Sequence, residues 1–338
     1  MREATVLALS ATDVRELVPM RTAVELMKQV FAAESRGDTI SPLRLPVNMP
    51  DGSGVVLYMP AFVPAQGDTP AASGAKVVSV FAGNRELGLP TIHAVVICVD
   101  PQTGAPLGIL EGGTITALRT GAVSGAATDL LAREDASTLA IIGAGAQGVT
   151  QAAAVCAVRP ITSIRVYDVF EASRTSFAAR LADWMPGGVP DVIVAESAEE
   201  AVREADVICT ATTATSPVFE DAWVKDGTHI NAIGAYTPEM QEIPDGTMAR
   251  AYIVVDVVEA ALHEAGDLIQ AIARGSISEA QVQTELGCIV TGEQPGRADA
   301  AQVTFFKSVG NAIQDMIVAG SALQLATAQG RGTTVQLQ

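Results

Sequence analysis

Three glycines near the middle of the chain have the spacing of a dinucleotide-binding loop. Gly143, Gly145 and Gly148 form the pattern G-x-G-x-x-G between an apolar, strand-like segment over 138–142 and a helix-like segment over 146–158. In such a unit the first glycine permits a tight turn, and the second lets a pyrophosphate approach the backbone. The third permits close packing of the helix against the strand. The free amides and the dipole of the helix start attract an anion. The predicted cofactor contacts are Gly143, Ala144, Gly145, Ala146, Gln147 and Gly148.

An acidic residue follows the next predicted strand, as a dinucleotide site requires. Asp168 ends the segment 163–168, about 20 residues after the loop. A carboxylate there accepts hydrogen bonds from the ribose hydroxyls of adenosine and repels a 2′-phosphate. The sequence therefore favours NAD(H). Arg165 and Arg174 are near in sequence, so the use of NADP(H) stays open.

Three basic residues lie inside apolar segments ahead of the glycine-rich loop. They are Arg44 in 43–47, Lys76 in 75–80 and Arg119 in 114–123. A charge embedded in an apolar segment is expected to be paired or functional. Each alone could be a structural ion pair or a side chain with only its stem buried. Together, beside a cofactor domain, they predict a binding site for a small carboxylate.

The elements that carry these residues fall into two groups. A predicted helix over 20–37 is followed by short strands separated by turns, which indicates a mainly antiparallel sheet; the strands cover 43–49, 54–63, 75–81 and 91–100. From about residue 114, helices alternate with buried apolar strands, which is typical of a parallel sheet covered on both faces. The predicted class is α/β, with a Rossmann-type doubly wound sheet and an α+β substrate and dimerisation domain.

The predicted domain limits follow from this change of pattern. Residues 1–115 with 303–330 form the substrate and dimerisation domain, and 116–302 form the dinucleotide-binding domain. A helix is predicted from residue 303, returning to the first domain, and 331–338 is predicted to be a loose tail.

Composition excludes several classes of partner. The 338 residues are 49% hydrophobic and carry a net charge of −17, so we expect no nucleic-acid partner. No apolar run is long enough to span a bilayer, and the first residues lack the pattern of a signal peptide.

The four cysteines are predicted to be reduced and mainly buried, which favours a cytoplasmic location. The three histidines lack ligand spacing, so no metal site is expected.

These motifs and the segments around them resemble the ornithine cyclodeaminase/mu-crystallin family. The resemblance rests on 74–84, on 88–122 with T-A-L-R-T ahead of the glycine-rich loop, and on 305–315. The family contains cyclodeaminases, amino-acid dehydrogenases, cyclic ketimine reductases and mu-crystallins. It implies a homodimer built through the N-terminal domain, with the active site between that domain and the Rossmann domain.

The resemblance also assigns roles to individual residues. The carboxylate-binding cations are Arg44, Lys76 and Arg119, and the pocket-lining positions are Met59 and Thr91. The cofactor contacts are Thr120, Ser308 and the loops 210–214 and 232–236, which include Ala211, Thr212 and Gly234. Lys76 and Arg119 are also the main catalytic candidates, and His93 or Tyr236 is a candidate proton relay. A packed strand histidine is the alternative for His93.

One segment departs from the cyclodeaminase pattern. Ornithine cyclodeaminases have a segment similar to G-G-D-x-P-G-K, whereas residues 234–242 here read GAYTPEMQE. Tyr236 therefore stands at the Asp position and Met240 at the Lys position. A phenol keeps its proton at neutral pH and poorly replaces the carboxylate base that ring closure and ammonia loss require. Glu111 replaces another Asp, which is a milder change. The segment favours the imine-reductase branch.

The sequence therefore predicts an NAD(P)H-dependent oxidoreductase that reduces a cyclic imino acid. Its substrate is Δ1-pyrroline-2-carboxylate or Δ1-piperideine-2-carboxylate, and its product is proline or pipecolate. The alternatives are cyclodeamination of ornithine or lysine, dehydrogenation of a linear amino acid, and a mu-crystallin-like protein that binds its ligands without useful turnover. Proline made from ornithine without net change in NADH would indicate cyclodeamination. Steady oxidation of NADH with an imino acid would exclude a protein that only binds its ligands.

Overall fold

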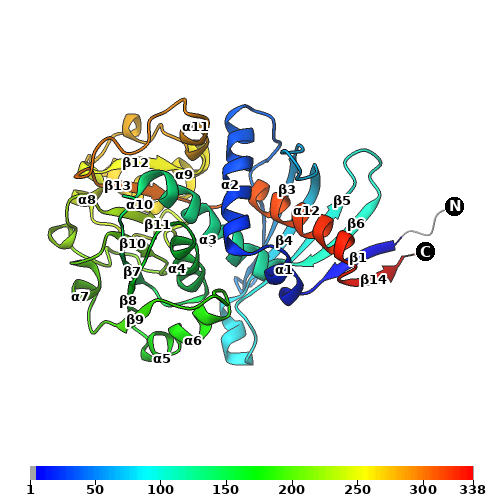
Figure 1. Ribbon diagram of the computed structural model, residues 1–338, viewed down its shortest axis with the longest axis horizontal. Coiled ribbons are helices and arrows are strands. Elements are labelled where there is room, and N and C mark those ends of the chain that lie inside the picture. The colour runs from blue at the N-terminus through cyan, green and yellow to red at the C-terminus, as the bar shows by residue number, and fades with distance from the viewer. Residues whose placement is uncertain (1–4, 338) are drawn as a thin grey trace. The chain divides into compact units, whose positions relative to one another are not determined.

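The computed structural model describes residues 5–337 and divides into two compact units. The first consists of Met1–Arg119 with Asn311–Gln338, and the second of Thr120–Gly310. Helix α3 (Gly112–Leu131) contributes residues to both. One unit is built on a mixed sheet and the other on a parallel sheet (Figure 1), so the predicted α/β class is confirmed.

The first unit contains a sheet in the order β14-β1-β6-β5-β4-β3-β2. Strands β1 and β6 are parallel and the other neighbouring pairs are antiparallel. The strands are β1 (Thr5–Leu9), β2 (Leu45–Asn48), β3 (Val55–Val63), β4 (Ala72–Val80), β5 (Ile92–Val99), β6 (Pro106–Glu111) and β14 (Thr333–Gln336). The mainly antiparallel character predicted for this sheet is confirmed.

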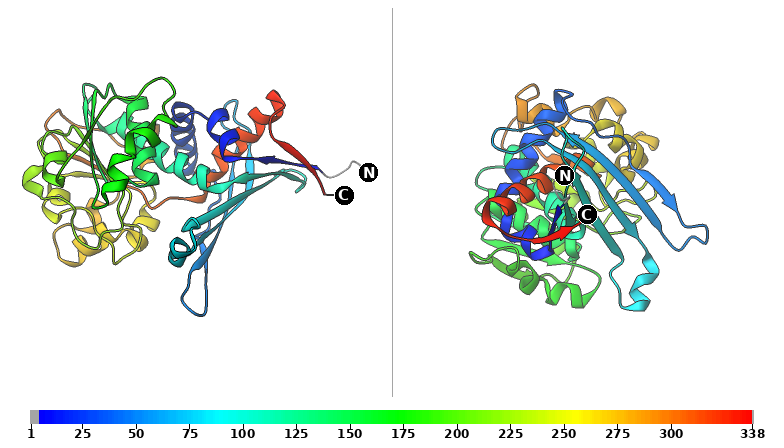
Figure 2. Two further views of the ribbon diagram at one scale, coloured as in Figure 1. Left: turned by 90° about the horizontal axis from the view of Figure 1, so that it is seen from below. Right: turned by 90° about the vertical axis from the view of Figure 1, so that its right-hand side faces the viewer.

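Helices cover one face of this sheet (Figure 2). They are α1 (Ala11–Leu17), α2 (Met20–Ser35) and α12 (Ala312–Gln329), and a 3-10 helix η1 (Ala82–Leu87) joins β4 to β5. Helix α2 buries Val24, Met27, Val30 and Phe31, the face predicted from the spacing of its apolar residues. Helix α12 packs on β3 and β4 and therefore covers the face that carries Lys76.

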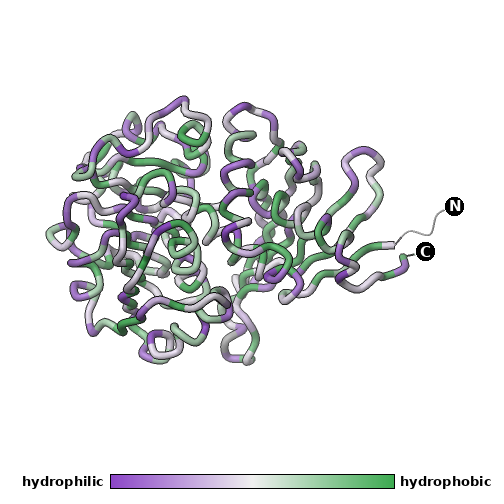
Figure 3. Tube along the Cα trace, viewed as in Figure 1, coloured by the Kyte–Doolittle hydropathy of each residue, from purple (hydrophilic) through white to green (hydrophobic). Residues whose placement is uncertain are grey.

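The second unit contains a fully parallel sheet in the order β12-β13-β11-β10-β7-β8-β9. The strands are β7 (Thr138–Ile142), β8 (Ser163–Tyr167), β9 (Asp191–Val194), β10 (Val207–Thr210), β11 (His229–Ala232), β12 (Tyr252–Val255) and β13 (Thr304–Lys307). Much of this sheet is hydrophobic along the trace, as Figure 3 shows, and β10, β11 and β13 are buried throughout. Such burial is expected for a parallel sheet with helices on both faces.

The helices of this unit are mostly short. They are α4 (Ala146–Val158), α5 (Glu171–Thr175), α6 (Phe177–Ala182), α7 (Ala198–Val202), α8 (Asp245–Arg250), α9 (Val258–Glu264), α10 (Gly266–Ala273) and α11 (Leu286–Thr291), with 3-10 turns η2 (Asp221–Trp223) and η3 (Glu279–Gln281). Residues 171–182 and 258–273 each form two consecutive short helices. None of the helices in the described residues is long and apolar enough to cross a membrane.

Two predictions near the C-terminus were wrong. The segment expected to begin a helix at residue 303 forms strand β13, in which Phe305 and Phe306 are fully buried between β11 and β12. The helix starts only at Ala312, after Gly310 turns the chain with φ +83° and Asn311 caps the first turn. The expected loose tail contains β14, which pairs with β1. Sheet pairing decided both outcomes, because hydrophobic pattern alone does not reveal a strand partner distant in sequence.

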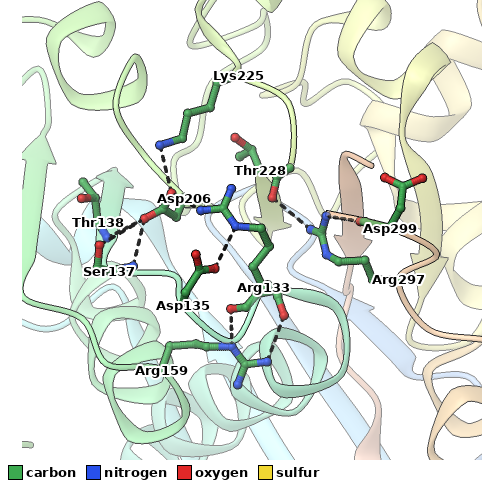
Figure 4. Close-up of polar contacts among 12 residues, drawn as sticks. Arg133, Asp135, Ser137, Thr138, Arg159, Asp206, Lys225, Thr228, Arg297 and Asp299 are labelled. Atoms are coloured by element: carbon green, nitrogen blue, oxygen red, sulfur yellow. Dashed lines mark hydrogen bonds and ion pairs between the residues drawn. The ribbon is translucent and has the colours of Figure 1, made fainter. Parts of the chain in front are cut away.

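Charged side chains in the second unit gather where its parallel strands begin (Figure 4). Asp206 accepts hydrogen bonds from the backbone N–H groups of Ser137 and Thr138 and forms ion pairs with Arg133 and Lys225. Burial raises the pKa of Asp206, but these hydrogen bonds and Lys225 bring it below its usual value. This network holds the amino ends of the strands together and lies at the opposite edge from the glycine-rich loop.

Candidate functional site

The glycine-rich loop, residues 143–148, joins β7 to α4 in the geometry predicted for a pyrophosphate site. Gly143 has φ +98°, and a Cβ atom on it would lie 2.5 Å from the carbonyl oxygen of Ala211. A Cβ atom on Gly148 would lie 2.1 Å from the carbonyl oxygen of Gly143. Gly145, which caps α4, and Ala146 are exposed, and a Cβ atom on Gly145 would meet nothing within 4 Å. Space is thus left where a pyrophosphate would approach the helix start.

Asp168 follows β8 and contacts this loop directly. Its Oδ2 accepts a hydrogen bond from the backbone N–H of Ala144 at 2.7 Å, and its Oδ1 accepts one from Phe170 at 2.9 Å. Each carboxylate oxygen retains a further lone pair that can accept from a ribose hydroxyl. The arrangement fits the adenosine half of a dinucleotide.

Two arginines lie beside Asp168, and only one of them was considered from sequence. Arg174 donates to the carbonyl oxygen of Asp168 at 3.0 Å, whereas Arg165 points toward Glu200. Arg180, which the sequence analysis missed, donates to the carbonyl oxygens of Ala144 and Ser173. Two cations are therefore held by the backbone of Asp168 and of the glycine-rich loop.

The remaining predicted cofactor residues follow β10, β11 and β13 or lie on α3 beside α4. Ala211 and Thr212 follow β10, and Gly234 follows β11. A Cβ atom on Gly234 would lie 2.2 Å from the carbonyl oxygen of Thr212, so these two loops touch. The carbonyl oxygen of Thr120 accepts from Nε2 of Gln151 on α4 at 3.0 Å. The loops and Thr120 are thus tied to the elements that flank the glycine-rich loop.

Ser308 follows β13 and is held by a buried carboxylate. Its Oγ donates to Oδ2 of Asp256 at 2.7 Å. The same oxygen accepts from the backbone N–H groups of Val309 and Gly310, each at 2.9 Å. Asp256, at the end of β12, was not identified from sequence, and it fixes the turn on which Ser308 sits.

The first unit brings two of the three predicted cations together at a carboxylate that was not identified from sequence. Lys76 Nζ lies 2.7 Å from Asp315 Oδ2, and Arg119 Nε lies 3.3 Å from Asp315 Oδ1. Lys76 is 1% exposed, and Asp315 is fully buried in the first turn of α12. We call Arg44, Lys76, Arg119 and Asp315 the cation cluster. Among the described residues, Lys76 and Arg119 both pair with the carboxylate of Asp315. The two positive charges therefore face a single negative charge.

The charges of the cluster act on Lys76 in opposite directions. Burial lowers the pKa of Lys76 to about 8, Asp315 opposes this shift, and Arg119 and Arg44 add to it. Arg44, which contributes least of these to the shift in the pKa of Lys76, lies just before β2 and is partly exposed. A second carboxylate bound here would relieve the repulsion among the cations.

A neighbouring amide adds a free donor to the cluster. Gln314 accepts a hydrogen bond from Arg119 Nη1 at 2.8 Å through its Oε1. Its Nε2 is buried and has no hydrogen-bond partner among the described residues. The signal that could have revealed Gln314 and Asp315 is a polar pair in the first turn of an otherwise apolar helix.

The pocket-lining and relay candidates are not all brought to the cluster. Met59 is buried and pairs with Lys76 across β3 and β4, so their side chains share a face. His93 pairs with Ser79 and is exposed on the other face of the sheet. Thr91 precedes β5, whose first residue pairs with Val80, about 13 Å along β4 from Lys76. The structure of the first unit places Met59, but neither Thr91 nor His93, beside Lys76.

Tyr236 belongs to the second unit and lies in the loop after β11. It is 44% exposed, and its backbone N–H donates to the carbonyl oxygen of Gly234 at 3.1 Å. An exposed phenol on this loop can face a ligand. The described residues contain no group of three or more His, Cys, Asp or Glu side chains arranged to hold a metal ion.

Comparisons with known proteins agree with this architecture. The Δ1-pyrroline-2-carboxylate reductase of Bacillus cereus is 40% identical over 331 residues, 98% of this chain and 99% of the relative. The ketimine reductase mu-crystallin of Mus musculus is 34% identical over 289 residues, 86% of each chain. The Δ1-pyrroline-2-carboxylate reductase of Thermococcus litoralis, solved with NADH and L-proline, has a TM-score of 0.91 and 38% identity over 98% of this chain and all of the other. The pattern of one family matches residues 4–325, and the chain therefore belongs to the ornithine cyclodeaminase/mu-crystallin family.

Proposed function

We propose that this protein reduces a cyclic imino acid, Δ1-pyrroline-2-carboxylate or Δ1-piperideine-2-carboxylate, to proline or pipecolate. The observation that carries the proposal is the buried pair of cations, Lys76 and Arg119, on the single carboxylate of Asp315. A reductase of this substrate must bind a carboxylate close to the carbon that is reduced. The similarity to the Bacillus cereus and Thermococcus litoralis reductases supports the same substrate class.

The second unit supplies the cofactor site in this proposal. The space at Gly145, the positive φ of Gly143 and the position of Asp168 fit a dinucleotide, and NADH is the preferred form. NADPH is an alternative, because Arg174 and Arg180 stand beside Asp168. When bound, the cofactor supplies a hydride to the imine carbon.

The chain's own residues hold the substrate for this reaction. Lys76 and Arg119 donate charge-assisted hydrogen bonds to the substrate carboxylate, and Gln314 Nε2 and Arg44 complete its surroundings. With a pKa of about 8, Lys76 is mainly protonated at neutral pH and keeps its charge. Hydride from the cofactor would add to the carbon of the C=N bond, and the π electrons would move to nitrogen. The iminium already carries its proton, so the product amine forms without a strong general acid.

The loop after β11 argues against cyclodeamination as the main reaction. Tyr236 stands where a base is needed for ring closure and ammonia loss, and Met240 replaces a Lys. Reduction of a preformed cyclic imine skips these steps. Tyr236 therefore does not act as a base and has the smaller role of facing the ligand.

We also propose that two copies of the chain associate through the open face of the mixed sheet. Exposed apolar side chains on neighbouring strands share that face, as the register shows: Leu45, Val47, Tyr58, Ile97, Leu107 and Ile109. An apolar surface of this kind marks a protein interface. Light scattering should give the mass of a dimer, and Ile97→Glu should give a monomer; a monomeric wild type would overturn this part of the proposal.

A cytoplasmic location is part of the same proposal. The four cysteines are free, in keeping with a reducing compartment, where nicotinamide cofactors are also available.

The carboxylate requirement can be tested with a matched pair of substrates. Δ1-pyrroline has the same ring and the same C=N bond as Δ1-pyrroline-2-carboxylate but lacks the carboxylate. We expect kcat/KM with Δ1-pyrroline to be lower by about 100-fold or more, because two charge-assisted hydrogen bonds are lost. Equal kcat/KM values for the two imines, followed by NADH absorbance, would show that the cation cluster does not bind the substrate.

A further inference from the structure

The second unit buries three charged side chains that the proposed chemistry does not use. Glu242, Asp267 and Lys307 are each 0% exposed, and Lys307 Nζ lies 3.2 Å from Asp267 Oδ2. Burial raises the pKa of Glu242 above its usual value; Asp267 raises it further, and Lys307 opposes the shift. A carboxylate is unfavourable in such a position unless it is held by good hydrogen bonds.

The carboxylate of Glu242 joins the ends of two neighbouring strands. Its Oε1 accepts from the backbone N–H of Thr212 at 2.6 Å, in the loop after β10. Its Oε2 accepts from the backbone N–H of Gly234 at 2.7 Å, in the loop after β11, and from Thr210 Oγ1 at 2.8 Å. Because β10 and β11 are parallel neighbours, one side chain fixes two loops at the same edge of the sheet.

The position of Glu242 is itself fixed by the other two charged residues. Asp267, in the first turn of α10, accepts from the backbone N–H groups of Glu242 at 2.7 Å and Ile243 at 3.0 Å. Lys307, at the end of β13, neutralises Asp267. The network therefore links β10, β11, β13 and α10.

The two loops also have no room to shift relative to each other. A Cβ atom on Gly234 would lie 2.2 Å from the Thr212 carbonyl oxygen and 2.4 Å from Glu242 Oε1. The loop after β10 in turn touches Gly143, through Ala211. In a doubly wound sheet a dinucleotide crosses this edge where the strand order reverses, here between β7 and β10. Its adenosine half lies toward β8, and its other half lies toward β10 and β11.

We propose that Glu242 is a positioning residue for the nicotinamide half of the cofactor. Its carboxylate sets the spacing of the loops at Thr212 and Gly234, and these loops receive the nicotinamide nucleotide. The adenosine half is held by the glycine-rich loop and Asp168, which Glu242 does not contact. This inference rests on the proposed use of a nicotinamide dinucleotide.

The substitution Glu242→Gln tests the inference while keeping the shape of the side chain. An amide has one oxygen and one NH2 group, so either orientation directs an NH2 group at the N–H of Thr212 or of Gly234. We expect the Kd for NADH to rise about tenfold or more, because a buried donor is left facing a donor. The Kd for adenosine 5′-monophosphate, which lacks the nicotinamide half, should stay within about twofold of the wild-type value. Both are measured by calorimetric titration.

A matched control is available on the same loop. Glu239 is exposed, and Glu239→Gln makes the same chemical change without touching the network. It should bind both ligands like the wild type. If Glu242→Gln does not fold, Thr210→Val decides the question, because it removes the hydrogen bond from the buried Thr210 hydroxyl to Glu242 Oε2 and keeps the carboxylate. It should show the same selective loss of NADH binding.

Two results would overturn the assignment. One is a folded variant that binds NADH as tightly as the wild type, and the other is an equal loss of NADH and adenosine 5′-monophosphate binding. Neither readout depends on turnover. A wild type that binds NADH but reduces no imino acid would overturn the proposed function and leave the role of Glu242 standing.

Discussion

The glycine-rich loop of the second unit and the cation cluster of the first differ in how their parts are spread along the chain. The loop and Asp168 lie within residues 143–168. The loop presents mainly backbone groups to a ligand, because its glycines have no side chains. The cluster draws on Lys76 in β4, Arg119 in α3 and Asp315 in α12. One site is sensitive to added atoms and the other to removed charges, so substitutions should separate cofactor binding from substrate binding.

The largest effect is expected from removing a charge from the cluster. Lys76→Met and Arg119→Met should each lower kcat/KM for the imino acid by about 100-fold, because each removes a charge-assisted hydrogen bond to the carboxylate. The Kd for NADH should change little, since the cofactor binds to the second unit. The control Lys28→Met removes a lysine that pairs with Glu25 on α2 and should behave like the wild type. Normal kinetics in both cluster variants would remove the cluster from the site.

A smaller effect is expected from one added methyl group in the loop. Gly148→Ala would place Cβ 2.1 Å from the Gly143 carbonyl oxygen, so helix α4 must move away from the turn. Overpacking of this kind costs about 1–3 kcal/mol, and we expect the Kd for NADH to rise about tenfold. Gly187→Ala is the matched control, because a Cβ atom there meets nothing within 4 Å. Unchanged NADH binding in Gly148→Ala would contradict the close packing described for the loop.

The choice between NADH and NADPH should depend on the charge of Asp168. Asp168→Asn keeps an oxygen that can accept from Ala144 N–H but removes the repulsion of a 2′-phosphate. With Arg174 and Arg180 nearby, we expect the preference for NADH over NADPH to fall about fivefold. The ratio of the two kcat/KM values measures this. A wild type that prefers NADPH would contradict the role given to Asp168.

The mildest test of the cluster is a change of pH. Lys76 has a pKa of about 8, below the value of 10.5 for an ordinary lysine, so it is charged below pH 8 and neutral above it. We expect kcat/KM at pH 8 to be about half its value at neutral pH, and to fall further as pH rises. In Lys76→Arg this fall should move to higher pH, because arginine stays charged. A fall at the same pH in both proteins would show that Lys76 is not the group that titrates.

Unfolding would not explain such a loss of activity. The folded pKa of Lys76 lies below the unfolded value, so between about pH 8 and 10.5 the unfolded chain binds more protons at this residue. The contribution of Lys76 to the free energy of unfolding therefore rises with pH across that window. Activity and this contribution to stability should move in opposite directions.

The same contrast explains what could be predicted from the sequence. Gly143, Gly145, Gly148 and Asp168 belong to one strand–turn–helix–strand unit, so local spacing was enough to assign them. Lys76 and Arg119 were noticed because a charge in an apolar segment needs an explanation. Their partner Asp315 was missed, because the helix that carries it comes about 200 residues later and packs on β4 only in the folded chain.

The structure also corrected predictions that depended on pairing between distant strands. The segment over 303–309 has an apolar pattern that suits a helix or a buried strand, and its place between β11 and β12 decided for the strand. The tail forms β14 only because β1 offers it an edge. Glu242 and Asp256 were missed for a related reason, since their partners lie on strands and loops that the sequence does not place side by side.

We propose that this chain uses a dinucleotide site and a cation cluster to reduce a preformed cyclic imino acid. The most direct measurement is the stoichiometry of the wild-type reaction with Δ1-pyrroline-2-carboxylate, with NADH followed by absorbance and proline by chromatography. We expect one NADH to be oxidised for each proline formed, and little or no proline to form from ornithine with catalytic NAD. Efficient release of ammonia and formation of proline from ornithine, without net oxidation of NADH, would contradict it.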